Sequence, residues 1–223
     1  MWNHFAKRRT VLLPTALGWL CLFLAVLTLP AFWWFRGESF LARTQRAPAD
    51  VLVVESWIGI EGIDAAGAEF VRGGYRNIVT TGGFTGRYWS QQRSRYSEIA
   101  GRELARMGIA TDRIIRAPDV DADRQRTFTS AVNVWRQLRA AGIQPAALNV
   151  FTMGAHARRS RLVFAKVFGP QTEVGVIAWT PSDYGAGPWW RSSYRAGELL
   201  KETVGYAFEA LLNSGRTTNS PAG

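Results

Sequence analysis

The amino-acid sequence predicts an α/β fold, with a mainly parallel sheet of about five strands, helices on both faces and one transmembrane helix before them. Two observations carry this prediction. Short apolar runs of buried-strand type alternate with amphipathic helical patterns, and short loops join them. Ahead of this alternating region, residues 11–35 contain no charged side chain.

The uncharged run at residues 11–35 predicts a membrane anchor, because it exceeds the roughly 20 apolar residues that span a bilayer core. Trp33 and Trp34 stand at its far end, where aromatic belts occur. Pro14 and Pro30 lie near its ends, where a helix tolerates proline best.

The basic residues around this run bear on its processing and orientation. Lys7-Arg8-Arg9 resembles the basic segment of a cleaved signal peptide, but the run is long and no clear small-x-small site precedes Arg36, which favours an uncleaved anchor. The same cluster favours a cytoplasmic N-terminus, although Arg36, Arg43 and Arg46 nearly balance it. We therefore expect a single-pass inner-membrane protein with a periplasmic main domain.

The organisation along the chain follows from these features. The expected segments are a short basic segment (1–10), a transmembrane anchor (11–35), a polar linker (36–49), an α/β domain (50–212) and a disordered tail (213–223).

Strand and helix patterns alternate through the domain. The expected strands are residues 50–54, 77–81, 113–115, 148–152 and 173–179. The expected helices are residues 62–73, 97–107, 127–141, 155–168 and 196–212. In the last helix, Leu199, Val204, Phe208 and Leu211 are available for the core.

Composition excludes several classes of function. The net charge is +10, and arginine supplies all but three of the 27 basic residues. No helix-turn-helix, finger spacing or RNA-binding aromatic motif is present, so nucleic acid is not an expected partner. Solvated faces, or attraction to anionic lipid head groups beside the anchor, explain the charge better. The single cysteine, Cys21, lies in the apolar run, so the domain has no disulfide or thiolate metal site.

The most informative stretch follows the fourth expected strand. His156 stands where that strand passes into a helix, and Arg158 and Arg159 adjoin it. Ligands of parallel sheets bind at the carboxyl ends of strands, so this stretch predicts a site for an anionic group. We expect a neutral ring acting as a donor or base, since a helix N-terminus disfavours the protonated form. A core histidine with satisfied ring nitrogens is the alternative.

Three other strand ends carry candidate groups. Glu55 follows the first strand and is a candidate general base, or else pairs with a structural arginine. Gly82-Gly83 closes the second strand and lets backbone N–H groups approach a phosphate, unless it is a simple turn. Arg126 and Thr127 open a helix whose N-terminus suits an anion, or Thr127 is a simple capping residue.

A metal site is not expected, because His156 is the only histidine in the domain and His4 precedes the anchor. A hard cation held by carboxylates alone, from Glu55, Asp119, Asp121 or Asp123, stays open. No cofactor is assigned.

Four short motifs stand in this order along the chain: Thr81-Gly82-Gly83, Glu98-Ile99-Ala100, Arg126–Ala131 and Phe151–Ser160. In this they resemble the YdcF/SanA/ElyC family of bacterial envelope-associated proteins, over about residues 50–178. The family's motifs there are Ser-Gly-Gly, Glu-x-Ala, Asn-Thr-x-Glu-Asn-Ala and Val-Thr-Ser-x-x-His-x-x-Arg-Ala. The matching positions are Gly82, Gly83, Glu98, Ala100, Thr127, Ala131, Thr152, His156 and Arg159.

The resemblance implies a Rossmann-like fold and a role in cell-envelope biogenesis, including peptidoglycan or polyprenyl-phosphate carrier metabolism. It separates Arg159, which matches the motif, from Arg158, which is free to face solvent. The expected catalytic residues are His156 and Glu55. The expected ligand-binding residues are Gly82, Gly83, Glu98, Arg126, Thr127, Thr152 and Arg159.

The function expected from these residues is binding, and in its stronger form processing, of a phosphorylated glycan or polyprenyl-phosphate carrier group. Two alternatives stay open: a non-catalytic envelope assembly module, and a nucleotide or S-adenosylmethionine binder that faces the cytoplasm. The sequence does not predict an oligomeric state.

Overall fold

The computed structural model describes residues 13–85, 94–119, 125–185 and 187–212. The chain divides into two units, residues 1–37 and residues 38–223, each of which we describe by itself. The expected basic segment 1–10 and tail 213–223 lie outside the described residues, as do Asp121 and Asp123.

The apolar run forms one long helix, α1 (Ala16–Leu41), which is long and apolar enough to cross a membrane. Its length and composition are also those of a signal sequence. Two sequence expectations about it were wrong. Pro30 lies inside the helix and not near its end. The linker was expected to begin at residue 36, but the helix continues to Leu41, whose side chain is fully buried.

The α/β domain is built on a five-stranded parallel sheet in the order β3-β2-β1-β4-β5. This confirms the expected fold class. At the centre of the sheet, Val53 pairs with Val79 on one side and with Val150 on the other. The strands are β1 (Val51–Glu55), β2 (Asn77–Gly82), β3 (Ile114–Pro118), β4 (Ala147–Met153) and β5 (Glu173–Trp179).

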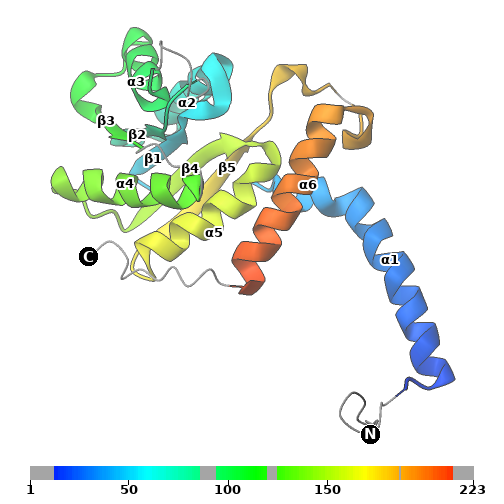
Figure 1. The fold of residues 1–223 in the computed structure, drawn as a ribbon. Helices are drawn as coiled ribbons and strands as arrows, with labels where there is room; N and C mark the ends of the chain where they lie inside the picture. The colour runs from blue at the N-terminus through cyan, green and yellow to red at the C-terminus, as the bar shows by residue number, and fades with distance from the viewer. Residues whose placement is uncertain (1–12, 86–93, 120–124, 186, 213–223) are drawn as a thin grey trace, which may run out of the picture. The chain divides into compact units, whose positions relative to one another are not determined.

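Helices cover both faces of the sheet (Figure 1). Val51 and Val53 of β1 pack with the helices on one face, and Leu52 and Val54 pack with those on the other, as strand alternation requires. The helices are α4 (Arg126–Ala140) and α5 (Ala157–Phe168) on the Val53 face, and α2 (Gly59–Gly73) and α3 (Tyr96–Arg106) on the Leu52 face.

The sheet grows from β1 to β3 in one direction and then crosses over to β4 and β5 on the other side of β1. The reversal creates a topological switch point between the carboxyl ends of β1 and β4, where open α/β sheets usually bind their ligands. Short 3-10 helices continue both strands there. They are η1 (Ser56–Ile58) and η3 (Gly154–His156).

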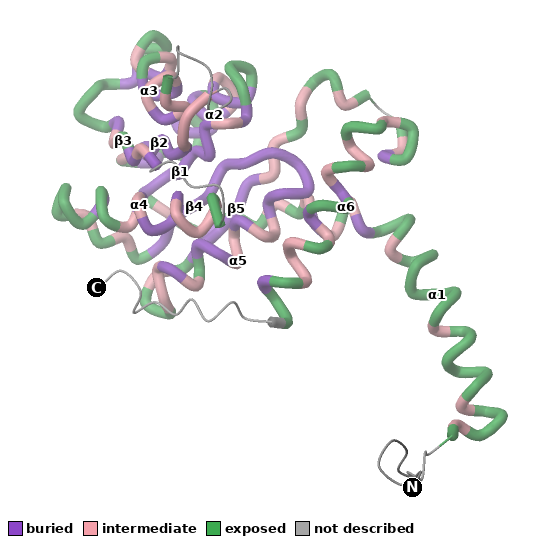
Figure 2. The backbone as a smooth tube through the Cα atoms, in the orientation of Figure 1, coloured by how far each residue is buried: buried purple, intermediate pink, exposed green. Residues whose placement is uncertain are grey.

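The last helix, α6 (Ser193–Ala207), ends in a π-helical turn, η6 (Phe208–Leu212). Leu199 is buried as expected, but Val204, Phe208 and Leu211 are 70%, 45% and 81% exposed, so their assignment to the core was wrong. The buried face of α6 carries Glu202 instead. Figure 2 shows α6 mostly in the colours of exposed and intermediate residues.

Residues 44–49, expected as a polar linker, are held against the domain. Gln45 forms an antiparallel bridge to Val176 of β5, and Asn149 exchanges two hydrogen bonds with the backbone of Ala47. Gly175 makes this crossing feasible. A Cβ atom there would lie 2.0 Å from the Asn149 Oδ1 atom and 2.5 Å from the Ala47 nitrogen.

Three further short 3-10 helices lie in loops. They are η2 (Thr111–Arg113), η4 (Ser182–Tyr184) and η5 (Trp189–Arg191).

Candidate functional site

The switch point of the sheet is closed by a buried pair, Glu55 from the end of β1 and His156 from the end of β4. The Glu55 Oε2 atom lies 3.4 Å from the His156 Nε2 atom. Ser160, one turn into α5, donates its hydroxyl hydrogen to the same carboxylate oxygen at 2.6 Å. The indole of Trp57 meets the imidazole edge to face at 5.1 Å between ring centroids. The sequence brings these groups together because strand, 3-10 turn and helix follow one another directly at both strand ends.

The second ring nitrogen of His156 faces α6. Its Nδ1 atom lies 3.1 Å from the Oε1 atom of Glu202 and 3.0 Å from an Arg159 guanidinium nitrogen. Arg159 binds Glu202 through two nitrogens, at 2.7 and 3.0 Å, and donates from its third to the Thr127 hydroxyl at 3.1 Å. The chain of contacts therefore runs from Ser160 through Glu55, His156 and Glu202 to Arg159 and Thr127. We call these six residues the buried network.

The ionisable groups of the buried network favour one another's charged forms. Burial disfavours a protonated imidazole, but the carboxylates of Glu55 and Glu202 outweigh it and raise the pKa of His156. Burial likewise opposes the charge on both glutamates, while His156, with Ser160 on Glu55 and Arg159 on Glu202, holds both pKa values below the usual range. The two carboxylates favour the protonated ring, whereas the expectation of a neutral ring considered only the helix N-terminus.

This arrangement limits what the network can do chemically. His156 and Arg159 face the carboxylates of Glu55 and Glu202, and His156 is only 6% exposed. Both ring nitrogens of His156 face carboxylates, so proton transfer to a ligand requires one of these contacts to open. The alternative in which Glu55 pairs with a structural arginine does not hold, since its partners are His156 and Ser160.

A second buried carboxylate, Asp119, follows β3 at the same edge of the sheet. Its oxygens accept hydrogen bonds from Ser130 and, at 3.2 Å, from Asn133, both on α4. Thr81 of β2 donates to it at 3.4 Å. Burial raises the pKa of Asp119, and these hydrogen bonds offset only part of that effect.

The glycine pair lies beside Asp119. Gly82 has a φ of +141°, a conformation that side-chain-bearing residues rarely adopt, and a Cβ atom there would lie 3.0 Å from the Cβ of Tyr96. The Gly82 carbonyl oxygen accepts a hydrogen bond from the Asp119 amide at 3.4 Å, and the Gly83 carbonyl accepts one from Tyr96 at 2.8 Å. Gly82 and Gly83 therefore join the ends of β2 and β3 and the start of α3.

The remaining residues that the sequence analysis singled out lie at different places in the domain. Thr152 lies at the end of β4, and its buried hydroxyl helps to lower the pKa of Glu55. Arg126 is exposed at the first position of α4. Glu98 lies away from the network, half-exposed on α3, and pairs with Arg116 at 3.5 Å. Arg158 does not simply face solvent, because its guanidinium lies 3.7 Å from the ring centroid of Phe40.

The start of α4 has the features of an anion site. Its N-cap residue, Gln125, has a left-handed backbone and makes no side-chain capping bond. The first N–H groups of a helix have no intrahelical acceptor, and they carry partial positive charge. Thr127, in this first turn, is the residue that Arg159 ties to the buried network.

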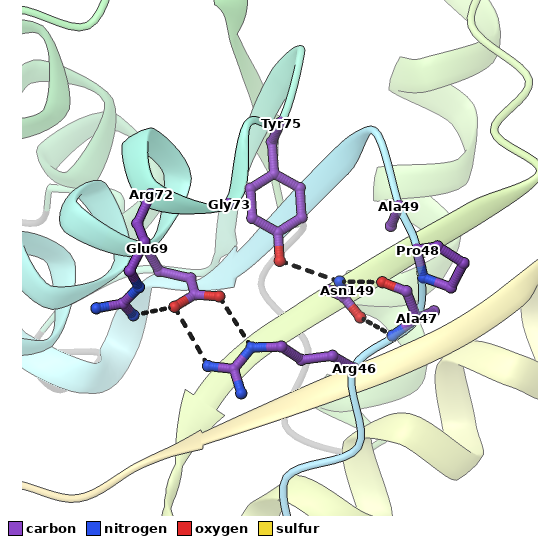
Figure 3. Close-up of a pocket in the computed structure, with 9 residues that line it drawn as sticks. All are labelled: Arg46, Ala47, Pro48, Ala49, Glu69, Arg72, Gly73, Tyr75 and Asn149. Carbon is purple, nitrogen blue, oxygen red and sulfur yellow. Dashed lines mark hydrogen bonds and ion pairs between the residues drawn. The ribbon is translucent and has the colours of Figure 1, made fainter.

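A cavity of about 350 Å³ lies at the opposite edge of the sheet (Figure 3). It is flanked by Asn149, whose amide donates to the Tyr75 hydroxyl, and by Glu69, which pairs with Arg46 and Arg72. These groups satisfy one another and fix residues 46–49 to the domain. Among the described residues, no cluster of three or more histidine, cysteine, aspartate or glutamate side chains could hold a metal ion.

Sequence reasoning missed Glu202, Ser160 and Trp57. Glu202 stands three residues after Leu199 and so shares its buried face, which is an unusual place for a carboxylate. A carboxylate at that position of the sequence therefore indicated a buried ionic contact. Ser160 and Trp57 gave no comparable signal, because their roles depend on how η1 and η3 approach each other.

The fold and site together define an α/β domain with a closed ionic network at its switch point. No protein-family model, curated protein or solved structure matches this chain.

Proposed function

We propose that this chain is a membrane-anchored envelope protein whose α/β domain binds a phosphorylated glycan or polyprenyl-phosphate carrier at the carboxyl edge of its sheet. The main domain lies on the periplasmic side in this proposal. The sequence resemblance to YdcF/SanA/ElyC proteins and the long apolar helix α1 support the envelope role.

The observation that carries the proposal is the convergence of α4 and the strand ends at the switch point. Arg126 and the uncapped start of α4 supply positive charge and N–H donors for a phosphoryl group. Thr127 connects this helix start to Arg159 and hence to the buried network. The anion is assigned to the α4 start because the cations of the network already have carboxylate partners.

Processing of the ligand is the stronger form of the proposal. It assigns proton transfer to Glu55 and His156, whose Oε2 and Nε2 atoms face each other at 3.4 Å at the switch point. The closed network specifically favours a second candidate, a binding or assembly module without catalysis, because no nitrogen of His156 is left for a substrate in this arrangement.

Two measurements test the proposal. Alkaline phosphatase or a fluorescent protein fused to the C-terminus reports the side of the membrane, and the proposal expects phosphatase activity in the periplasm. The full chain in detergent is then titrated with a polyprenyl phosphate and with the corresponding polyprenol. Binding of the phosphate alone supports the proposal, whereas equal binding of both, or of neither, contradicts it.

A further inference from the structure

Helix α6 and its terminal turn carry an exposed apolar stripe. Leu200, Val204, Phe208 and Leu211 are 65%, 70%, 45% and 81% exposed. Their spacing of three or four residues places them along one side of a helix. We call these four residues the α6 stripe. Contiguous apolar surface of this kind marks contact with a partner or with a membrane.

The charges around the α6 stripe suit a surface of anionic lipid. The Lys201 side chain beside it is 61% exposed. The three acidic residues of α6 and its turn have other partners. Glu202 and Glu209 are buried in ion pairs, and Glu198 accepts a hydrogen bond from Tyr184. Lys201 therefore borders the stripe, and its carboxylate partner Glu202, 3.5 Å away, is buried and also binds His156 and Arg159.

Residues that directly follow the uncharged run along the chain bind α6. Arg195 of α6 binds the Glu38 carboxylate through two nitrogens, at 2.9 and 2.7 Å. The ring of Phe40 meets that of Tyr206 edge to face, with 5.6 Å between centroids. The uncharged run ends at Phe35. Glu38, which binds α6, follows the uncharged run after only two intervening residues of the chain.

We infer that α6 lies on the bilayer surface, with the α6 stripe in the boundary between head groups and acyl chains and with Lys201 toward anionic head groups. This inference rests on the membrane anchoring in the proposed function. A surface helix with an apolar stripe and a basic border has the composition of an interfacial helix.

The inference also connects the membrane to the candidate site. Glu202 lies on the buried face of α6 and binds His156 and Arg159. Leu200 and Val204 lie on the exposed face of the same helix. A ligand that remains in the bilayer by a lipid tail would therefore reach the switch point beside a helix that already contacts the lipid.

Lipid contact is measured by labelling single cysteines of the full chain with an environment-sensitive fluorophore in vesicles that contain phosphatidylglycerol. The quencher is a lipid with a spin label on its acyl chain. The native Cys21, in the apolar helix, reports insertion of the anchor. In a Cys21→Ser background, Val204→Cys reports the α6 stripe, and Val71→Cys, 73% exposed on α2, is the matched control.

The inference expects strong quenching at Cys21 and about threefold more quenching at position 204 than at position 71. Quenching at Cys21 with equal, weak quenching at positions 204 and 71 overturns the inference and leaves the anchor intact. No quenching at Cys21 overturns the anchoring and the inference with it. Protection of position 204 from water without lipid quenching indicates a second copy or another protein on the stripe, and also overturns it.

Discussion

The Glu202 carboxylate on α6 joins the two cations of the candidate site, since its Oε1 atom lies 3.1 Å from His156 and its Oε2 atom 2.7 Å from Arg159. The last helix is thereby fixed to the carboxyl edge of the sheet. Removing this carboxylate leaves Arg159 and the Nδ1 side of His156 without their shared carboxylate partner.

Glu202→Gln is therefore expected to destabilise the domain by about 3 kcal/mol, the range found when one partner of a buried ion pair is lost. Chemical denaturation of the full chain in detergent measures the free energy of unfolding. Glu173→Gln, at an exposed position of β5, is the matched control and is expected to change it little. Equal effects of the two substitutions would contradict the ionic network.

The charge state of His156 predicts a pH dependence of stability. Its pKa in the folded protein is raised above 6.5, so its stabilising contribution is complete below that pH and declines as the pH rises through the folded pKa. The free energy of unfolding of the wild type minus that of His156→Gln is expected to fall between mildly acidic and alkaline pH. A difference that rises with pH would show that the ring is buried in its neutral form.

Substitution of Asp119 is expected to stabilise the domain, whereas substitution of Glu202 destabilises it. Because burial raises its pKa, the folded protein is less stable at neutral pH than it would be with a neutral group there. Asp119→Asn can keep the bond from Asn133 on one side-chain atom and donate to Ser130 from the other. We expect a higher melting temperature at neutral pH and no gain at acid pH. A melting temperature of Asp119→Asn below that of the wild type at both neutral and acid pH would contradict a raised pKa of Asp119.

Gly175, in the edge strand β5, predicts a steric effect of substitution. Gly175→Ala places a methyl group against the Asn149 side chain and the backbone of Ala47, and a loss of about 3 kcal/mol is expected because both must shift to make room. Gly197→Ala is the control, because nothing lies within 4 Å of its added Cβ atom. Thermal unfolding compares the two, and equal stability of both variants would contradict the packing of residues 44–49.

The sequence allowed the sheet and its flanking helices to be predicted because buried parallel strands read as apolar runs between amphipathic patterns. The partners of His156 could not be predicted in the same way. Glu55 is 101 positions earlier and Glu202 is 46 positions later, and only the folded topology brings them together. The outward face of α6 was misassigned because an apolar stripe has the same spacing in the sequence whether it is buried in a core or exposed.

Binding at the start of α4 tests the central claim most directly. The full chain in detergent is titrated with a polyprenyl phosphate, and Arg126→Ala is compared with Arg102→Ala, which removes an exposed arginine from α3. Loss of a charge-assisted bond predicts about a tenfold rise in the dissociation constant for Arg126→Ala and little change for Arg102→Ala. The same dissociation constant for both variants would contradict a phosphoryl site at this end of the sheet.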